Sequence, residues 1–110
     1  MRTLRLSLRA VQDIEEIRAF TVRVWGLDQW LRYFAALTAA LERIAEEPTC
    51  GRPRDLIRQG MRSLSFQRHL IFYQSAPDSG GRVAVLRIVH ERRNFAALSY
   101  HDDLDRYPHS

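Results

Sequence analysis

The chain contains no lysine. All 17 of its basic residues are arginine, and against 13 acidic residues they give a formal charge of +4. The planar guanidinium fork of arginine suits carboxylates and phosphates better than an ammonium does, which favours an acidic partner. Because an arginine bias can equally reflect genomic base composition, the charge alone identifies no partner.

Cysteine and long apolar runs are also scarce. Cys50 is the single thiol, which excludes an internal disulfide framework, leaves no zinc site and fits a reducing compartment. No apolar run approaches the roughly 20 residues that span a bilayer. Residues 1–6 alternate polar and apolar, unlike a signal peptide. We therefore expect a soluble, cytoplasmic protein with no metal site and no cofactor.

Internal repeats and low-complexity segments are absent too. A chain of 110 residues, 45% of them hydrophobic, can bury a core of its own but is too short for two domains. We expect one domain over residues 1–110.

The first half of the chain predicts one strand and two helices. Residues 2–7 alternate around leucines, as in a half-buried strand, and Ser7 is placed to cap the helix that follows. Gly26 is expected to end that helix and Asp28 to cap the next, which stops before Pro48. The first helix has a polar side, to which we assign Gln12, Asp13, Glu16 and Arg23. The second has an apolar stripe of Leu31, Phe34, Leu37 or Thr38, Leu41 and Ile44.

The second half predicts three strands, near residues 61–67, 69–75 and 82–90, with a Pro-Asp-Ser-Gly-Gly turn before the last. Residues 48–60 read as an irregular connector, and residues 95–104 as a short helix or a docked tail. The order β-α-α-β-β-β predicts an α+β fold in which two helices cover one face of a mostly antiparallel sheet.

Several short sequence words occur in a fixed order along nearly the whole chain: AVQDIEEI at 10–17, WG at 25–26, EP at 47–48, GRP at 51–53, GMR at 60–62, HLIFY at 69–73 and RIVHERRN at 87–94. In that order and spacing they resemble the ParE branch of the RelE/ParE toxin superfamily, the small toxins of bacterial toxin-antitoxin operons. The resemblance implies a RelE/ParE-like fold and a type II toxin that a ParD-like antitoxin, encoded beside it, neutralises.

Two activities exist within that superfamily. ParE-like members poison DNA gyrase without a known catalytic site of their own, whereas RelE-like members cut mRNA on the ribosome. A nuclease needs several basic or proton-transferring groups around one phosphate, and the candidates for such a set are Arg62, His69 and Arg92. The set is incomplete, because three places that RelE-like enzymes use for chemistry hold Leu64, Leu70 and Leu98. We therefore expect a gyrase inhibitor that is not an enzyme, with an mRNA interferase as the alternative and a toxin fold without toxicity as a third.

Binding roles follow from the same resemblance. For the antitoxin we predict contacts from Trp30, Tyr33, Arg62 and Arg87, with the two aromatic rings partly exposed as an adhesive patch. Arg87 has two open interpretations, a solvated or salt-bridged face of the sheet or an anchor for an acidic antitoxin residue. For gyrase we predict contacts from Arg92, Arg93 and Phe95, and nucleic acid is met only through gyrase or the antitoxin.

Two further expectations concern the strand ends and the tail. His69 and His90 are interpreted as structural groups that can be neighbours across the sheet. Because ParE-like toxins depend on their C-terminal region, deletion of the residues after Asn94 is expected to abolish toxicity and to leave antitoxin binding mostly intact.

Overall fold

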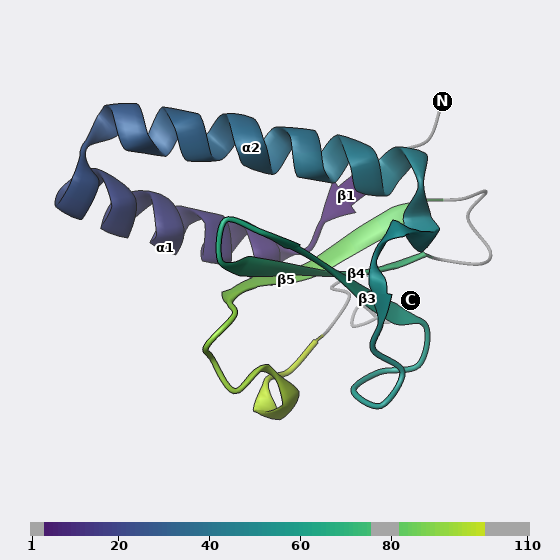
Figure 1. Ribbon diagram of the computed structural model, residues 1–110. Helices are drawn as coiled ribbons and strands as arrows, with labels where there is room; N and C mark the ends of the chain where they lie inside the picture. The colour runs from purple at the N-terminus through teal and green to yellow at the C-terminus, as the bar shows by residue number, and fades with distance from the viewer. Residues whose placement is uncertain (1–3, 76–81, 101–110) are drawn as a thin grey trace, which may run out of the picture.

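Two helices lie side by side across one face of a five-stranded sheet in the computed structural model, which describes residues 4–75 and 82–100 (Figure 1). The elements run in the order β1 (Leu4–Leu6), α1 (Leu8–Trp25), α2 (Leu27–Glu46), β2 (Arg52–Pro53), β3 (Met61–Phe66), β4 (His69–Ser75) and β5 (Val83–His90). The α+β fold predicted from the sequence is confirmed. No helix in the described ranges is both long and apolar enough to cross a bilayer.

The sheet has the strand order β1-β5-β4-β3-β2. Strands β3, β4 and β5 form an antiparallel meander, and β1 pairs in parallel with β5, with Leu4 opposite Val83. The three predicted strands are therefore correct to within a residue or so. The sequence did not reveal β2, a two-residue edge strand in the expected connector, because Pro53 lacks a backbone donor and so short a run has no periodicity.

Gly26 alone connects the two helices of the hairpin. The backbone N–H of Gly26 donates to the carbonyls of Thr21 and Val22, and its φ of +94° lies in the region that favours glycine. Gly26 also begins α2, so the predicted cap at Asp28 is wrong: Asp28 lies in the first turn instead. The cap predicted for α1 is confirmed, because Ser7 Oγ accepts from the N–H of Ala10 at 2.9 Å.

The buried faces of both helices differ in part from those that the sequence suggested. α1 buries Ala10, Asp13 and Thr21, and α2 buries Trp30, Tyr33, Leu37 and Ile44. The end of the hairpin that holds Gly26 extends past the sheet (Figure 1), so apolar side chains near it have no strand to cover. They stay largely exposed: Phe20, Val24, Trp25, Leu27, Leu31 and Phe34. The expectation that Trp30 and Tyr33 are partly exposed is wrong, since each is only 7% exposed.

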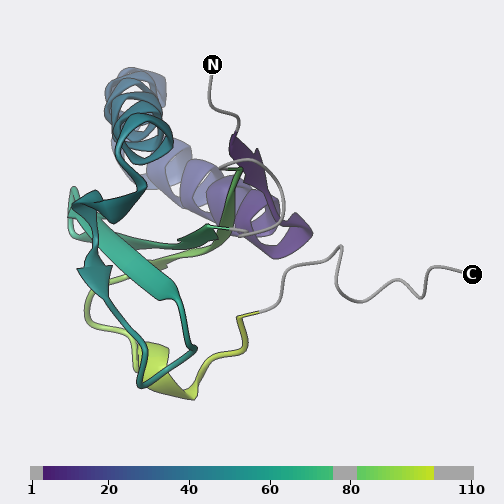
Figure 2. The same ribbon diagram turned by 90° about the vertical axis from the view of Figure 1, so that its right-hand side faces the viewer.

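A second, smaller core lies on the other face of the sheet. The segment after β5 runs beneath the strands on the side away from the helices (Figure 2), where Tyr100 is buried and Phe95 and Leu98 pack beside it. These side chains cover Met61, Leu70, Phe72, Ala84, Leu86 and Val89. The short helix predicted near residues 95–104 is a single 3-10 turn, Phe95–Ala97, and residues 101–104 lie outside the described residues.

Candidate functional site

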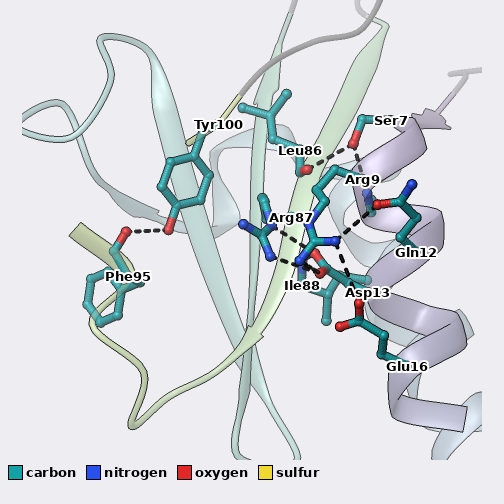
Figure 3. A network of polar contacts seen from close by, with 11 residues as sticks. Ser7, Arg9, Gln12, Asp13, Glu16, Leu86, Arg87, Ile88, Phe95 and Tyr100 are labelled. Carbon is teal, nitrogen blue, oxygen red and sulfur yellow. Dashed lines mark hydrogen bonds and ion pairs between the residues drawn. The ribbon is translucent and has the colours of Figure 1, made fainter. Parts of the chain in front are cut away.

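A buried ion pair joins α1 to β5. Arg87 donates from Nε to Asp13 Oδ2 at 3.0 Å and from Nη2 to Asp13 Oδ1 at 2.9 Å (Figure 3). The two side chains are 5% and 2% exposed. Such a two-pronged contact is the strong form of the arginine–carboxylate bond. Of the two interpretations of Arg87, the structure shows the ion pair, and the assignment of Asp13 to a polar outer side of α1 is wrong.

Asp13 also replaces a missing strand. β1 ends at Leu6, which would leave the outer edge of β5 without partners beyond Val85. Ser7 takes over there, with its N–H donating to the Val85 carbonyl at 2.9 Å and its hydroxyl to the Leu86 carbonyl at 2.8 Å. The N–H of Ile88 then donates to Asp13 Oδ2 at 3.0 Å. Helix α1 thus satisfies backbone groups that a buried sheet edge cannot leave unpaired.

A β-bulge explains how Arg87 reaches this helix. Phe72 pairs with Arg87 but the next residue, Tyr73, pairs with Val85, so Leu86 is an extra residue in β5. Such a bulge redirects the neighbouring side chains of its strand. The sequence carries no sign of this bulge and so could not predict the direction of the Arg87 side chain.

A pocket of about 580 Å³ lies between the helical hairpin, the turn that joins β3 to β4 and the end of β5. Its apolar wall comes from the helices, with Ile17, Phe20 and Trp25. Its polar side comes from the turn between β3 and β4 and from the end of β5, with Arg68, His69, His90 and Arg93. The volume falls in the range of about 300–1,000 Å³ that is usual for ligand pockets.

The two histidines of the pocket face each other across the sheet. His69 and His90 are register partners with ring centroids 5.4 Å apart, so the expectation that they are neighbours is confirmed. His69 Nδ1 lies 3.2 Å from the Gln67 carbonyl, which can only accept, so this nitrogen carries a proton. His90 Nδ1 accepts from the N–H of Arg92 at 3.1 Å. Burial lowers the pKa of His69 and is the largest effect; the hydrogen bond to the Gln67 carbonyl raises this pKa, and His90 lowers it.

Tyr33 also lines this pocket. Its ring meets the His69 ring edge-on, with centroids 5.5 Å apart. Burial raises the pKa of Tyr33, so the phenol stays neutral. Tyr33 Oη is the one buried side-chain polar atom in residues 4–75 and 82–100 that has no hydrogen-bond partner. An orphan of this kind costs roughly 1–3 kcal/mol.

The remaining predicted site residues do not converge on the pocket. Arg62 Nη1 donates to the backbone carbonyls of Gly51 at 2.8 Å and Thr49 at 3.4 Å. Arg62 is four residues along β3 from Phe66, the partner of His69, which is roughly 13 Å at the usual strand rise. Arg92 is exposed just beyond β5, outside the residues that line the pocket.

Phe95 and the aromatic residues of α2 have structural neighbours. The Phe95 ring packs 5.4 Å from that of Phe72, and the Arg54 guanidinium lies 5.0 Å above it. Trp30 stacks on Tyr33 at 5.8 Å. Sequence reasoning brought His69, Tyr33 and Arg93 into consideration separately but missed Arg68, whose position in the tight turn between two predicted strands was the available signal.

The burial of His69 predicts lower folding stability in mild acid. Because burial lowers the pKa of His69 from its usual 6.5, the unfolded chain takes up the proton first. The stability contributed by neutral His69 is therefore present above about pH 6.5 and is lost as the pH falls through the lowered pKa. Urea unfolding of the wild type and of His69→Gln, above and below this range, measures the effect. The wild type should lose more stability on acidification than the variant, and equal losses would contradict the assignment.

The comparisons with known proteins agree on one family. The sequence model of the family described as "ParE toxin of type II toxin-antitoxin system, parDE" matches residues 4–95. The chain is similar to "Toxin ParE1" of Caulobacter vibrioides, with 35% identity over 97 residues that cover 88% of this chain and 97% of the relative. It is also similar to "Toxin ParE1" of Mycobacterium tuberculosis, with 39% identity over 87 residues, 79% of this chain and 87% of the relative.

Two solved structures share the fold. A chain from the chromosomal ParDE system of P. aeruginosa superposes with a TM-score of 0.68 at 18% identity, covering 82% of this chain and 96% of that one. A chain from the RelBE2 toxin-antitoxin complex of Mycobacterium tuberculosis gives a TM-score of 0.57 at 24% identity, covering 81% and 96%. At these identities the likeness concerns the fold alone.

Proposed function

This chain belongs to the ParE toxin family of type II toxin-antitoxin systems, and on that premise we propose that it poisons DNA gyrase, acts without catalytic chemistry of its own and is neutralised by a ParD-like antitoxin encoded beside it. The family assignment supports a toxin. The choice of gyrase over the ribosome is supported by the positions of the basic side chains.

The observation that carries this choice is the separation of Arg62 from His69. Cleavage of a phosphodiester needs acid, base and charge-stabilising groups within hydrogen-bond reach of one phosphate. Arg62 is held by the carbonyls of Thr49 and Gly51 at one end of β3, and His69 lies at the other end. Two groups roughly 13 Å apart along a strand cannot serve one reacting centre. An mRNA interferase built on Arg62, His69 and Arg92 is therefore disfavoured.

Exposed apolar side chains at the hairpin tip support a protein partner. Trp25 is 69% exposed and Leu31 54%, and large apolar surfaces of this kind usually mark interaction sites. We propose that an amphipathic segment of the antitoxin lies on this tip and on the adjoining sheet end. Trp30 then supports this surface from beneath, and Tyr33 is reached through the pocket that it lines. A direct antitoxin contact by the buried Arg87 would require its ion pair with Asp13 to open.

For gyrase we keep Arg92 and Arg93 as candidate contacts, because both are exposed at the end of β5. Guanidinium groups there can bind phosphates or carboxylates of the enzyme–DNA complex. The Arg54 guanidinium lies over the Phe95 ring. We therefore propose that Phe95 contributes to gyrase binding indirectly, by holding the segment after β5 in place.

A supercoiling assay with DNA gyrase, run beside a translation-dependent mRNA cleavage assay, tests the proposal. We expect inhibition of supercoiling alone, and relief of that inhibition by the neighbouring operon product. Cleavage of mRNA alone would establish the interferase instead. Activity in neither assay would indicate a toxin fold that has lost toxicity, and failure of the two operon proteins to associate at micromolar concentration would remove the antitoxin assignment.

A further inference from the structure

The pocket between α1 and the ends of β4 and β5 holds an unused hydrogen-bonding group. Tyr33 lines the pocket and only 7% of the residue is exposed, yet its buried Oη has no hydrogen-bond partner in the described residues. A neutral phenol satisfies itself by donating to an acceptor. Because native proteins rarely leave such a group unmatched, a ligand acceptor that enters the pocket is the natural partner.

The two carboxylates that line the pocket have ion-pair partners, whereas its two arginines have none in the described residues. Asp13 is neutralised by Arg87, and Glu16 lies 3.6 Å from Arg9. Arg68 and Arg93, by contrast, have no ion-pair partner within residues 4–75 and 82–100. An incoming carboxylate would therefore meet two guanidinium groups and the donor of Tyr33, which is the chemistry that binds an acidic side chain.

The backbone holds Arg68 at the pocket at some cost. Gln67 and Arg68 have φ of +47° and +66°, and neither is glycine. A two-residue hairpin turn with both φ values positive normally uses Asn-Gly, so bulkier residues there are strained. A residue such as Asn would fit the turn better, whereas arginine at this position supplies a cation.

The helix side of the pocket carries large apolar side chains beside polar ones, and it is continuous with the exposed hairpin tip. Phe20 and Trp25 are 51% and 69% exposed, and both line the pocket. A small inorganic anion would use the arginines but leave this side bare. A second copy of this chain would bring a formal charge of +4 to a basic rim. The combination fits a peptide that carries a carboxylate beside apolar side chains.

We propose that this pocket receives an acidic amphipathic segment of a partner protein, with one Asp or Glu carboxylate accepting from Tyr33 Oη beside Arg68 and Arg93 and an apolar neighbour packing on Phe20 and Trp25. The inference rests on the proposed function only in taking the neighbouring antitoxin as the source of that segment. It assigns the recognition of acidic side chains to a different place from the Arg87 anchor considered from sequence.

The first test measures the affinity of the full-length chain for the neighbouring antitoxin. Tyr33→Phe removes only the unpaired hydroxyl, so the variant should fold at least as stably as the wild type and bind about 10-fold or more weakly, as expected for a lost hydrogen bond to a charged acceptor. Arg68→Asn removes a charge while relaxing the turn, so it should be no less stable, bind more weakly and show a smaller salt dependence. Arg52→Asn removes an equal charge at the far edge of the sheet and should bind like the wild type.

The second test does not depend on the antitoxin. Acetyl-Phe-Glu-Leu-amide is titrated into the wild-type protein while the ring resonances of His69 and His90 are followed by NMR, with acetyl-Phe-Gln-Leu-amide as the control. We expect shifts with the Glu peptide, weaker shifts with the Gln peptide and weaker binding by Tyr33→Phe. If the antitoxin fails to bind the wild type while the Glu peptide shifts these rings, the partner assignment fails and the pocket stands. The inference would be overturned if Tyr33→Phe bound the antitoxin with wild-type affinity. It would also be overturned if the antitoxin did not bind the wild type and millimolar Glu peptide shifted neither ring.

Discussion

Replacing Asp13 with asparagine is expected to lower the free energy of unfolding by about 3–5 kcal/mol, the usual cost of removing one partner from a buried ion pair. The substitution leaves the guanidinium of Arg87 buried, only 4% of the residue being exposed, without a compensating charge. It also weakens the acceptor of the Ile88 N–H. A loss of this size is a large fraction of the roughly 5–15 kcal/mol that stabilises an ordinary domain.

Glu15→Gln on the same helix is the matched control. It makes the same chemical change in a carboxylate that pairs with Arg18 at 2.9 Å, but here the side chains are 59% and 48% exposed. Exposed pairs contribute about 0–1 kcal/mol. Urea unfolding of the two variants at neutral pH compares them directly. Equal costs would show that burial of the Asp13–Arg87 pair has no energetic consequence.

Ending the chain after Asn94 is expected to destabilise the fold as well as to abolish toxicity. The deletion removes Phe95 and Tyr100, whose rings pack 5.4 Å and 4.9 Å from that of Phe72, and it strips the cover from the second core. Truncation of one buried aromatic side chain costs about 3–5 kcal/mol. Loss of toxicity in this variant would therefore not by itself identify a gyrase contact.

A chain that ends after Tyr100 separates the two effects. It keeps the aromatic cover and the hydrogen bond from Tyr100 Oη to the Phe95 carbonyl at 2.6 Å, and removes only residues 101–110, which lie outside the described residues. We expect thermal unfolding close to that of the full chain. If toxicity disappears in this stable variant, the tail itself acts on the target. If the chain ending at Asn94 unfolds like the full chain, the structural role of the segment is refuted.

The sequence predicted elements whose signals are local. Ser7 before the first helix, Gly26 at its end and the strands that begin at Met61 and His69 each depend on neighbouring residues, and the structure confirms all of them. Periodicity also predicted that two helices would cover one face of the sheet. It could not locate the hairpin beyond the edge of the sheet, which is why Phe34 is exposed and Tyr33 buried.

The candidate site was harder to predict because it depends on distant partners. Asp13 looks like a surface residue in any helical projection, and only the early end of β1 makes its carboxylate necessary inside the fold. The bulge at Leu86 has no sequence signature and redirects Arg87. The pocket combines residues from the helical hairpin, the β3–β4 turn and the end of β5, so no sequence spacing could reveal Arg68 as the neighbour of Tyr33.

The contacts that attach β1 and α1 to the sheet can form only late in the synthesis of the chain, after β5 has been made. Arg87 is 74 residues beyond its partner Asp13, and Leu86 is 79 beyond Ser7. The helical hairpin and the β3–β4 hairpin can form from local contacts. The backbone groups that Ser7 and Asp13 bind belong to β5, so α1 cannot attach to the sheet before β5 has been made. At about 5–20 residues per second, the ribosome needs roughly 4–15 s to travel that distance. A nascent toxin therefore stays unfinished for seconds, and a message broken before the codons of β5 yields a polypeptide that cannot close its sheet.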